Sequence, residues 1–136
     1  MLTFLLVISL IWVCYTDIRY RIIKNHSVVF IAVVLTMASF IDGKLPHWVS
    51  ACLIFFIGAI AVYANFIGAG DIKLLSALAL SFPLADVPEF IFFITLSGLP
   101  LAVVVYLLHR YGKKKFSRSV PYGVAIVSGY FVMLFL

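Results

Sequence analysis

Residues 48–86 read WVSACLIFFIGAIAVYANFIGAGDIKLLSALALSFPLAD, two apolar stretches with the carboxylate of Asp71 between them. A stretch of about 20 apolar residues is long enough to cross a bilayer as a helix. A carboxylate at membrane depth is costly to place and is therefore usually functional. A second carboxylate, Asp17, follows the first apolar stretch of the chain. Asp17 and Asp71 are therefore the first candidates for function.

The composition extends this apolar pattern to the whole chain. Of the 136 residues, 65% are hydrophobic and 11% are charged, and the mean hydropathy is +1.23. No polar stretch is long enough to form a soluble domain. We therefore expect an all-α, polytopic membrane helix bundle of about six transmembrane helices with short loops, in which residues 1–136 form a single domain.

Six apolar stretches predict the helices of this bundle. They lie at about residues 2–16, 27–42, 48–66, 72–86, 89–108 and 120–136. The first lacks the basic segment of a signal peptide, so we expect it to be retained. The fourth is interrupted by Ser81-Phe82-Pro83. This interruption leaves three alternatives open: a span of the bilayer, a shorter helix that ends near residue 82, and a hairpin with the neighbouring stretch.

The loops between these stretches indicate the topology. Asp17 follows the first span and Asp71 the third, and odd-numbered loops lie on one side of a membrane, so the two carboxylates can meet. The odd loops carry Arg19, Arg21, Lys24, Arg110, Lys113, Lys114, Lys115 and Arg118, whereas the even loops carry Lys44, Asp42, Asp86 and Glu89. The positive-inside rule predicts a multi-pass protein of the inner (plasma) membrane, with both aspartates on the cytoplasmic side and both termini on the opposite side.

The net charge of +5 does not indicate a nucleic-acid-binding protein. The basic residues are split between two juxtamembrane loops without aromatic stacking partners, and we expect them to set the topology and contact anionic lipid headgroups. Cys14 and Cys52 each lie in an apolar stretch, and two isolated cysteines do not make a zinc site. We expect neither a metal nor a cofactor.

Three segments resemble the prepilin peptidases, also called type IV leader peptidases or A24 aspartic peptidases. The segments are TDIRYRIIKN at 16–25, GAGDIKLL at 68–75, which contains a Gly-x-Gly-Asp (GxGD) motif, and VPYGVAI at 120–126. Their order and spacing are similar to those of the short members associated with tight-adherence (Flp) pili. The chain departs from the family at Lys24, where proline commonly precedes Asn25.

The resemblance implies a membrane aspartic endopeptidase with Asp17 and Asp71 as its catalytic dyad. Its substrate would be a pilin or pseudopilin precursor, cut at the cytoplasmic membrane face between a basic leader and a hydrophobic helix. Repulsion between two close carboxylates keeps one protonated and leaves the other free to activate water. We do not assign the N-methyltransferase activity of the long members. The sequence indicates neither the oligomeric state nor which aspartate holds the proton.

Four residues are candidates to support the active-site loop. Gly68 and Gly70 can adopt backbone conformations barred to other residues and let a neighbouring segment come close. Lys73 is expected to extend to the headgroups, with a second possible role beside the dyad. Asn25 is expected to hydrogen-bond the start of the second helix.

The third segment begins on the same side of the predicted bundle as the dyad. Pro121 suits the first turn of a helix, Tyr122 suits the membrane interface, and Gly123 suits close helix packing. We expect these three residues to shape the rim of the active site.

Two alternatives remain open from the residues. The aspartates could relay protons or bind a cation in a small transporter subunit, or the chain could be a noncatalytic scaffold of a secretion system. Away from Asp17 and Asp71, the acidic residues Asp42, Asp86 and Glu89 gather at the far surface and mark no continuous route across the membrane. This arrangement favours proteolysis.

Overall fold

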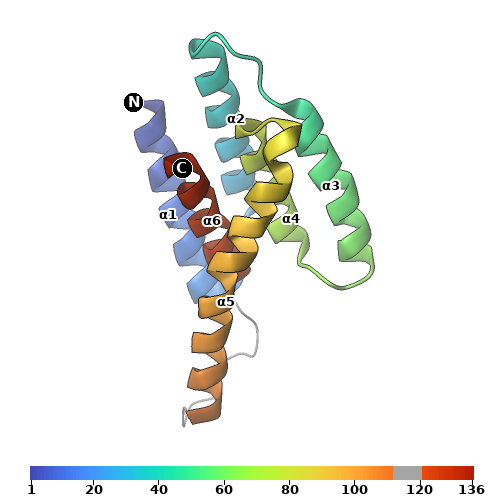
Figure 1. The fold of residues 1–136 in the computed structure, drawn as a ribbon. Helices are drawn as coiled ribbons and strands as arrows, with labels where there is room; N and C mark the ends of the chain where they lie inside the picture. Colours follow the sequence, from blue (N-terminus) through green and yellow to red (C-terminus); the bar gives the residue numbers. More distant parts are fainter. Residues whose placement is uncertain (112–120) are drawn as a thin grey trace.

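The computed structural model describes residues 1–111 and 121–136, which form six α-helices and no strand (Figure 1). The helices are α1 Leu2–Tyr20, α2 Asn25–Ile41, α3 Trp48–Tyr63, α4 Ala69–Leu78, α5 Val87–Tyr111 and α6 Tyr122–Phe135, with 3-10 turns η1 Ala79–Ser81 and η2 Leu84–Asp86 between α4 and α5. The predicted all-α membrane helix bundle is confirmed. Lys113, Lys114, Lys115, Arg118 and Val120 of the sequence analysis lie outside the described residues.

Helix α1 is longer than the sequence predicted. It continues past residue 16 to Tyr20, because nothing in this stretch breaks a helix. It ends where Arg21 adopts the left-handed conformation, with φ 55°, and donates its backbone N–H to the Asp17 carbonyl at 3.0 Å. Asp17 therefore lies inside the C-terminal end of α1, and the expectation that it lies in a loop is wrong.

The fourth predicted span, 72–86, is not one continuous helix. Helix α4 has 10 residues, and at 1.5 Å per residue it rises about 15 Å, half of a hydrocarbon core about 30 Å thick. Pro83 restricts the residue before it to an extended conformation, and Phe82 has φ −122° and ψ 137°. The Leu80 carbonyl in η1 accepts the His47 N–H at 3.1 Å. The broken end of α4 thus finds its backbone partner on the segment that leads into α3.

The lengths of the other helices are unequal. Two segments, Leu2–Tyr20 and Leu84–Leu108, are long and apolar enough to cross a membrane, and α2, α3 and α6 are shorter apolar helices. Large apolar side chains cover the outer surface, for example Phe56 at 67% exposed and Ile60 at 70%. Such a surface suits a lipid bilayer, because apolar side chains that contact hydrocarbon avoid the free-energy cost of contact with water.

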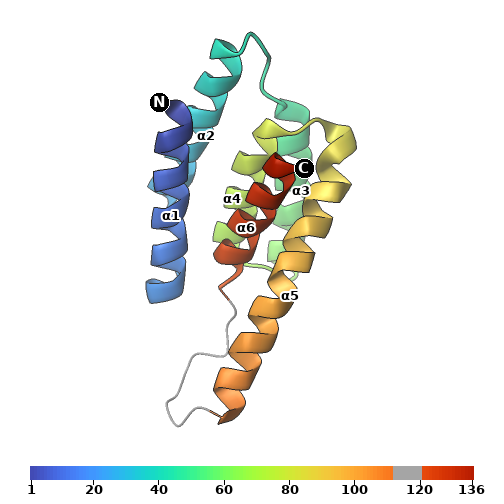
Figure 2. The same ribbon diagram turned by 60° about the vertical axis from the view of Figure 1, so that its left-hand side comes forward.

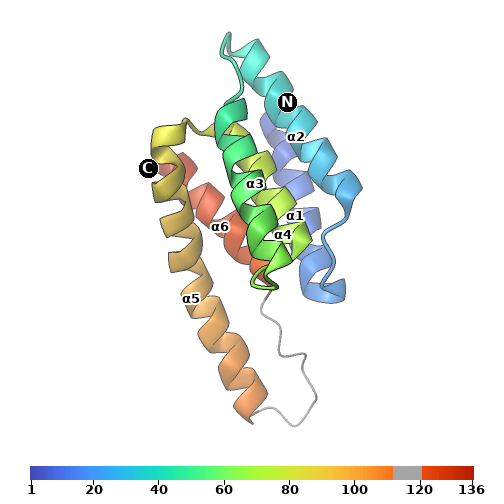
Figure 3. The ribbon, with the colours of Figure 1, turned by 90° about the vertical axis from the view of Figure 1, so that its right-hand side faces the viewer.

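Helices α4 and α6 form the centre of the bundle. Helix α4 packs against α2, α3 and α6, and α6 also packs against α1 and α5. In Figure 2 these two helices lie between α1 and α2 on one side and α3 and α5 on the other, and Figure 3 shows α3 beside α4 from the opposite face. A Cβ atom on Gly129 would lie 2.7 Å from the Ile94 backbone, so α5 and α6 approach closely.

Successive helices run in alternating directions, which groups the candidate residues. The end of α1 and the starts of α4 and α6 lie at one end of the bundle, whereas the N- and C-termini lie at the other end (Figure 1). Asp17, Asp71 and Gly123 belong to these three helix ends. The fold therefore brings three distant segments of the sequence to one place.

Candidate active site

Asp17 is held by the N-terminus of α6. Its side chain is 6% exposed, and its Oδ2 atom accepts the backbone N–H of Gly123 at 2.9 Å. The first N–H groups of a helix have no partner within the helix, and the helix dipole is positive at that end. The Asp17 carboxylate thus supplies a hydrogen-bond acceptor for an N–H group that has no partner within α6.

The contact between Asp17 and α6 requires glycine at residue 123. A Cβ atom there would lie 2.8 Å from Oδ2 of Asp17 and 3.1 Å from its Cγ, closer than side chains pack. Pro121 is buried and precedes the first residue of α6, while Tyr122 is 56% exposed. Gly123 therefore contacts the carboxylate itself, and of the three residues it is the one that holds Asp17.

Asp71 lies in the first turn of α4, half-buried, and both glycines before it provide space. A Cβ atom on Gly68 would lie 2.9 Å from Oδ2 of Asp71, and one on Gly70 would lie 3.1 Å from Cβ of Ile23. Neither glycine has a positive φ, and Gly68 has φ −71° and ψ 141°. The expected special backbone conformation is therefore wrong, whereas the expected close approach of a neighbouring segment is found at Gly70.

The two carboxyl groups line one cavity of about 490 Å³. Its other lining residues are Arg21, Ile22, Ile23, Gly68, Ala69, Gly70 and Tyr122. They come from the end of α1 and the loop after it, the turn that begins α4, and the first residue of α6. The meeting of Asp17 and Asp71, expected from the parity of the loops, is present in the structure.

The environment of Asp71 favours its protonated form. This residue precedes the predicted fourth span, residues 72–86, and lies in neither of the two segments that are long and apolar enough to cross a membrane. Burial raises the pKa of its carboxyl group from 3.8 to about 6, the charge of Asp17 acts in the same direction, and the Gly68 backbone N–H acts against them. Two carboxyl groups that interact in this way lose their protons as a pair.

Lys73 and Asn25 lie apart from this cavity and contact each other. The Lys73 Nζ donates to the Asn25 Oδ1 at 3.1 Å in an exposed hydrogen bond. The bond joins α4 to the first residue of α2. Asn25 thus bonds a side chain of α4, and the expectation that it bonds the start of its own helix is wrong.

Arg21 is a cavity residue that the sequence indicated only as a topology signal. It lies four residues after Asp17, near enough for its charge to act on that carboxylate. Its Nη1 atom is buried and has no hydrogen-bond partner among residues 1–111 and 121–136. Arg21 lies beyond the end of α1 in the left-handed conformation, so a helix-face spacing does not apply to it, and its closeness to Asp17 in the sequence was the signal that could have found it.

The chemistry available in the cavity is that of a carboxyl pair. In the described part of the chain, His, Cys, Asp and Glu side chains form no group of three that could hold a metal ion. The ionised carboxyl of such a pair can act as general base on a water molecule, and the protonated carboxyl can act as general acid on the carbonyl group that this water attacks. This arrangement supports hydrolysis of an ester or a peptide bond.

Comparison with known proteins yields one match. A sequence model of the type IV leader peptidase family matches residues 4–103, which include Asp17 and Asp71 but not the segment around Gly123. No curated protein and no solved structure matches the chain.

Proposed function

Since the chain belongs to the type IV leader peptidase family, we propose that it is a membrane aspartic endopeptidase with Asp17 and Asp71 as its catalytic dyad. Membership makes the protein a peptidase, and pilin precursors are the substrates that the family implies. One observation carries the assignment of residues, namely that carboxyl groups from α1 and α4 line the same cavity. The fixed position of Asp17 against α6 supports it.

The dyad would cleave the peptide bond through an activated water molecule. The ionised carboxyl takes a proton from water, and the resulting hydroxide attacks the scissile carbonyl carbon. The neutral carboxyl hydrogen-bonds the carbonyl oxygen and stabilises the charge that develops on it. The tetrahedral intermediate then collapses, the C–N bond breaks, and the amine leaves with a proton from the dyad. Burial and the charge of Asp17 raise the pKa of Asp71, which supports the retention of one proton by the pair at a higher pH than a free aspartate allows.

The proposed substrate is a precursor of a type IV pilin or pseudopilin of the Flp type, and the proposed site of cleavage is the cytoplasmic membrane face. Arg19, Arg21 and Lys24 belong to the end of α1 and the loop after it. The end of α1 lies at the same end of the bundle as the start of α4 (Figure 1), and the positive-inside rule predicts a cytoplasmic position for such basic residues. The termini would then face the opposite side of the plasma membrane.

Cleavage of a pilin-like precursor in membranes tests this function. Asp17→Asn and Asp71→Asn are each expected to lower the rate at least about a hundredfold at equal expression, because neither amide can act as the base or share the proton. Asp42→Asn is the matched control. It makes the same substitution at an exposed carboxylate at the C-terminal end of α2, the end away from the dyad. The Asp42→Asn protein is expected to process the precursor at the native rate.

The outcomes separate the candidate functions. Processing retained in either dyad variant would remove that residue from the chemistry. Processing retained in both would favour the scaffold, and ion-dependent flux that survives Asp→Glu at either position would favour the transporter.

A further inference from the structure

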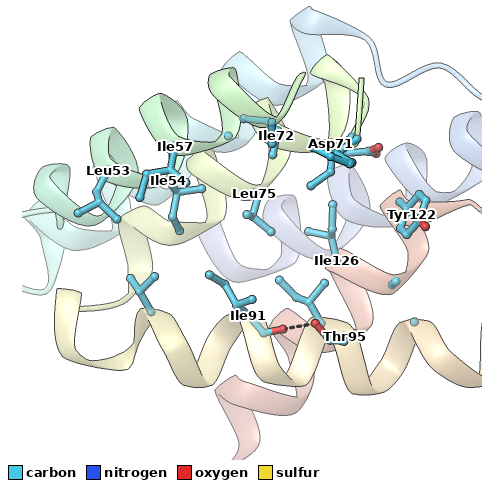
Figure 4. Close-up of a pocket in the computed structure, with 18 of the residues that line it drawn as sticks. Leu53, Ile54, Ile57, Asp71, Ile72, Leu75, Ile91, Thr95, Tyr122 and Ile126 are labelled. Atoms are coloured by element: carbon cyan, nitrogen blue, oxygen red, sulfur yellow. Dashed lines mark hydrogen bonds between the residues drawn. The ribbon is translucent and has the colours of Figure 1, made fainter. Parts of the chain in front are cut away.

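A second, larger cavity begins at the same carboxylate. It measures about 540 Å³, within the roughly 300–1,000 Å³ range of ligand pockets, and Asp71 and Tyr122 line both cavities. Its walls come from α3, α4, α5 and α6, and Figure 4 shows Asp71 at one end with apolar side chains along the rest. We call this cavity the apolar groove.

The floor and walls of the apolar groove have different origins. Ile72 and Leu75 of α4 form the floor, while one face of α3 and one face of α5 form the two walls. Along α5 the lining runs from Val87 to Ala102, about 22 Å at 1.5 Å per residue. That length matches about four turns of an additional helix lying in the apolar groove.

The lining offers few polar atoms. The hydroxyl of Thr95 donates to the Ile91 carbonyl of its own helix at 2.9 Å, the bond drawn in Figure 4. Its donor is therefore already used, and the ionisable groups of the lining are Asp71 and the Tyr122 phenol at the dyad end. The apolar groove thus suits a segment that is apolar for about four turns and becomes polar where it reaches Asp71.

We propose that the apolar groove binds the hydrophobic helix of the precursor and so sets the position of the cleaved bond. This inference rests on the proposed function. A bound helix would begin beside Asp71 and run along α3 and α5 toward Leu53, which leaves the leader outside the bundle at the dyad end. Ala61, Gly98 and Ala102 give the walls small side chains, so a second backbone can come close.

A phospholipid is the alternative occupant of the apolar groove. An acyl chain could fill the apolar part, but the lining has no basic side chain to pair with a lipid phosphate, and its ionisable groups are Asp71 and the Tyr122 phenol. A peptide presents a polar, uncharged bond at that end, which a carboxyl group can hydrogen-bond.

Photo-crosslinking from neighbouring residues of α5 tests the inference. A photoreactive amino acid replaces Thr95, which lines the apolar groove, or Leu96, which is 51% exposed but does not line it. Both variants also carry Asp71→Asn, so that the precursor binds without being cut. The probe is a synthetic precursor with a basic leader and an apolar helix of about 20 residues, in vesicles. We expect crosslinks from residue 95 to the first four turns of that helix and few from residue 96.

A bulky substitution gives an independent kinetic readout. In the otherwise native protein, Thr95→Trp is expected to raise the KM for the precursor about tenfold, the effect of no longer burying one substrate side chain of leucine size. Leu96→Trp places the same ring on the outer side of α5 and is expected to leave the KM unchanged.

The results distinguish this inference from the function on which it rests. If the native protein cuts the precursor but residue 95 crosslinks only lipid or a second copy of the chain, the apolar groove is not the substrate site and the peptidase assignment stands. Equal crosslinking to the precursor from 95 and 96 also overturns the inference. If the native protein cuts no precursor, the proposed function fails, whatever the crosslinks show.

Discussion

Gly123→Ala tests whether the N-terminus of α6 positions Asp17, the proposed catalytic carboxylate. The added Cβ atom would lie 2.8 Å from Oδ2 of Asp17, whereas ordinary contacts begin at 3.4 Å, so the carboxylate must move by about 0.6 Å or lose its 2.9 Å hydrogen bond. A hydrogen bond to a charged group is worth about 1.5–3 kcal/mol. Loss of this amount in the transition state corresponds to a rate about tenfold to a hundredfold lower.

The assay is precursor cleavage per folded protein, together with thermal unfolding in the same detergent. Alanine favours helices over glycine by about 1 kcal/mol, so Gly123→Ala is not expected to unfold α6. Gly129→Ala is the control for a packing defect. Its Cβ atom would lie 2.7 Å from the Ile94 backbone, away from the dyad, so it should lower the melting temperature without lowering the activity of the molecules that remain folded.

The refuting result is a Gly123→Ala protein that folds and cleaves at the native rate. A shift of Asp17 would then have no effect on the rate. Either the contact between Asp17 and α6 would be absent, or Asp17 would take no part in the cleavage reaction. A loss of activity that follows the loss of folded protein, as in Gly129→Ala, would also contradict the argument.

Three further predictions concern pH, the loop before α4 and the core. The pKa of Asp71 is raised from 3.8 to about 6, so the folded protein holds this proton more tightly than the unfolded chain, and stability should fall as the pH rises from about 4 to about 6. Asp71→Asn should therefore melt at a higher temperature than the native protein at pH 7 but not at pH 4, and an equal difference at both would disprove it. Gly70→Val should reduce cleavage more than Gly70→Ala, because the Cβ atom alone already lies 3.1 Å from Cβ of Ile23, and equal activity in the two variants would show that this contact is unimportant. Tyr130→Phe removes a 3.0 Å hydrogen bond to Ser81 and should lower the free energy of unfolding by about 1 kcal/mol, which denaturant titration would measure; an unchanged value would mean that water replaces the bond.

The sequence predicted the fold class and the meeting of Asp17 with Asp71, because both depend on long-range patterns. Hydropathy marks the helices, and the parity of their connections decides which ends coincide. The exact extent of α1 was not predictable in this way, because hydropathy falls at the polar residues near Asp17 while the backbone remains helical to Tyr20.

The contacts that position the site residues could not be predicted from sequence patterns. Gly123 was expected to contribute to a packing face, yet its backbone N–H bonds Asp17, and no side-chain property of glycine encodes that partner. Gly68 and Gly70 were expected to allow an unusual backbone conformation and a close approach, and the structure shows only the close approach, to Asp71 and Ile23, which the sequence did not indicate as the partners. Such requirements depend on which residues lie beside each glycine in the folded protein, and the sequence alone does not show these neighbours.

The bond between Asp17 and Gly123 also has a consequence for the synthesis of this chain. Both aspartates leave the ribosome well before α6 does, so a nascent protein contains its two acids while the group that fixes one of them is still missing. Full activity is expected to begin only after the last helix has inserted. The order of translation would thus act as a delay, which protects other membrane proteins from an unfinished protease.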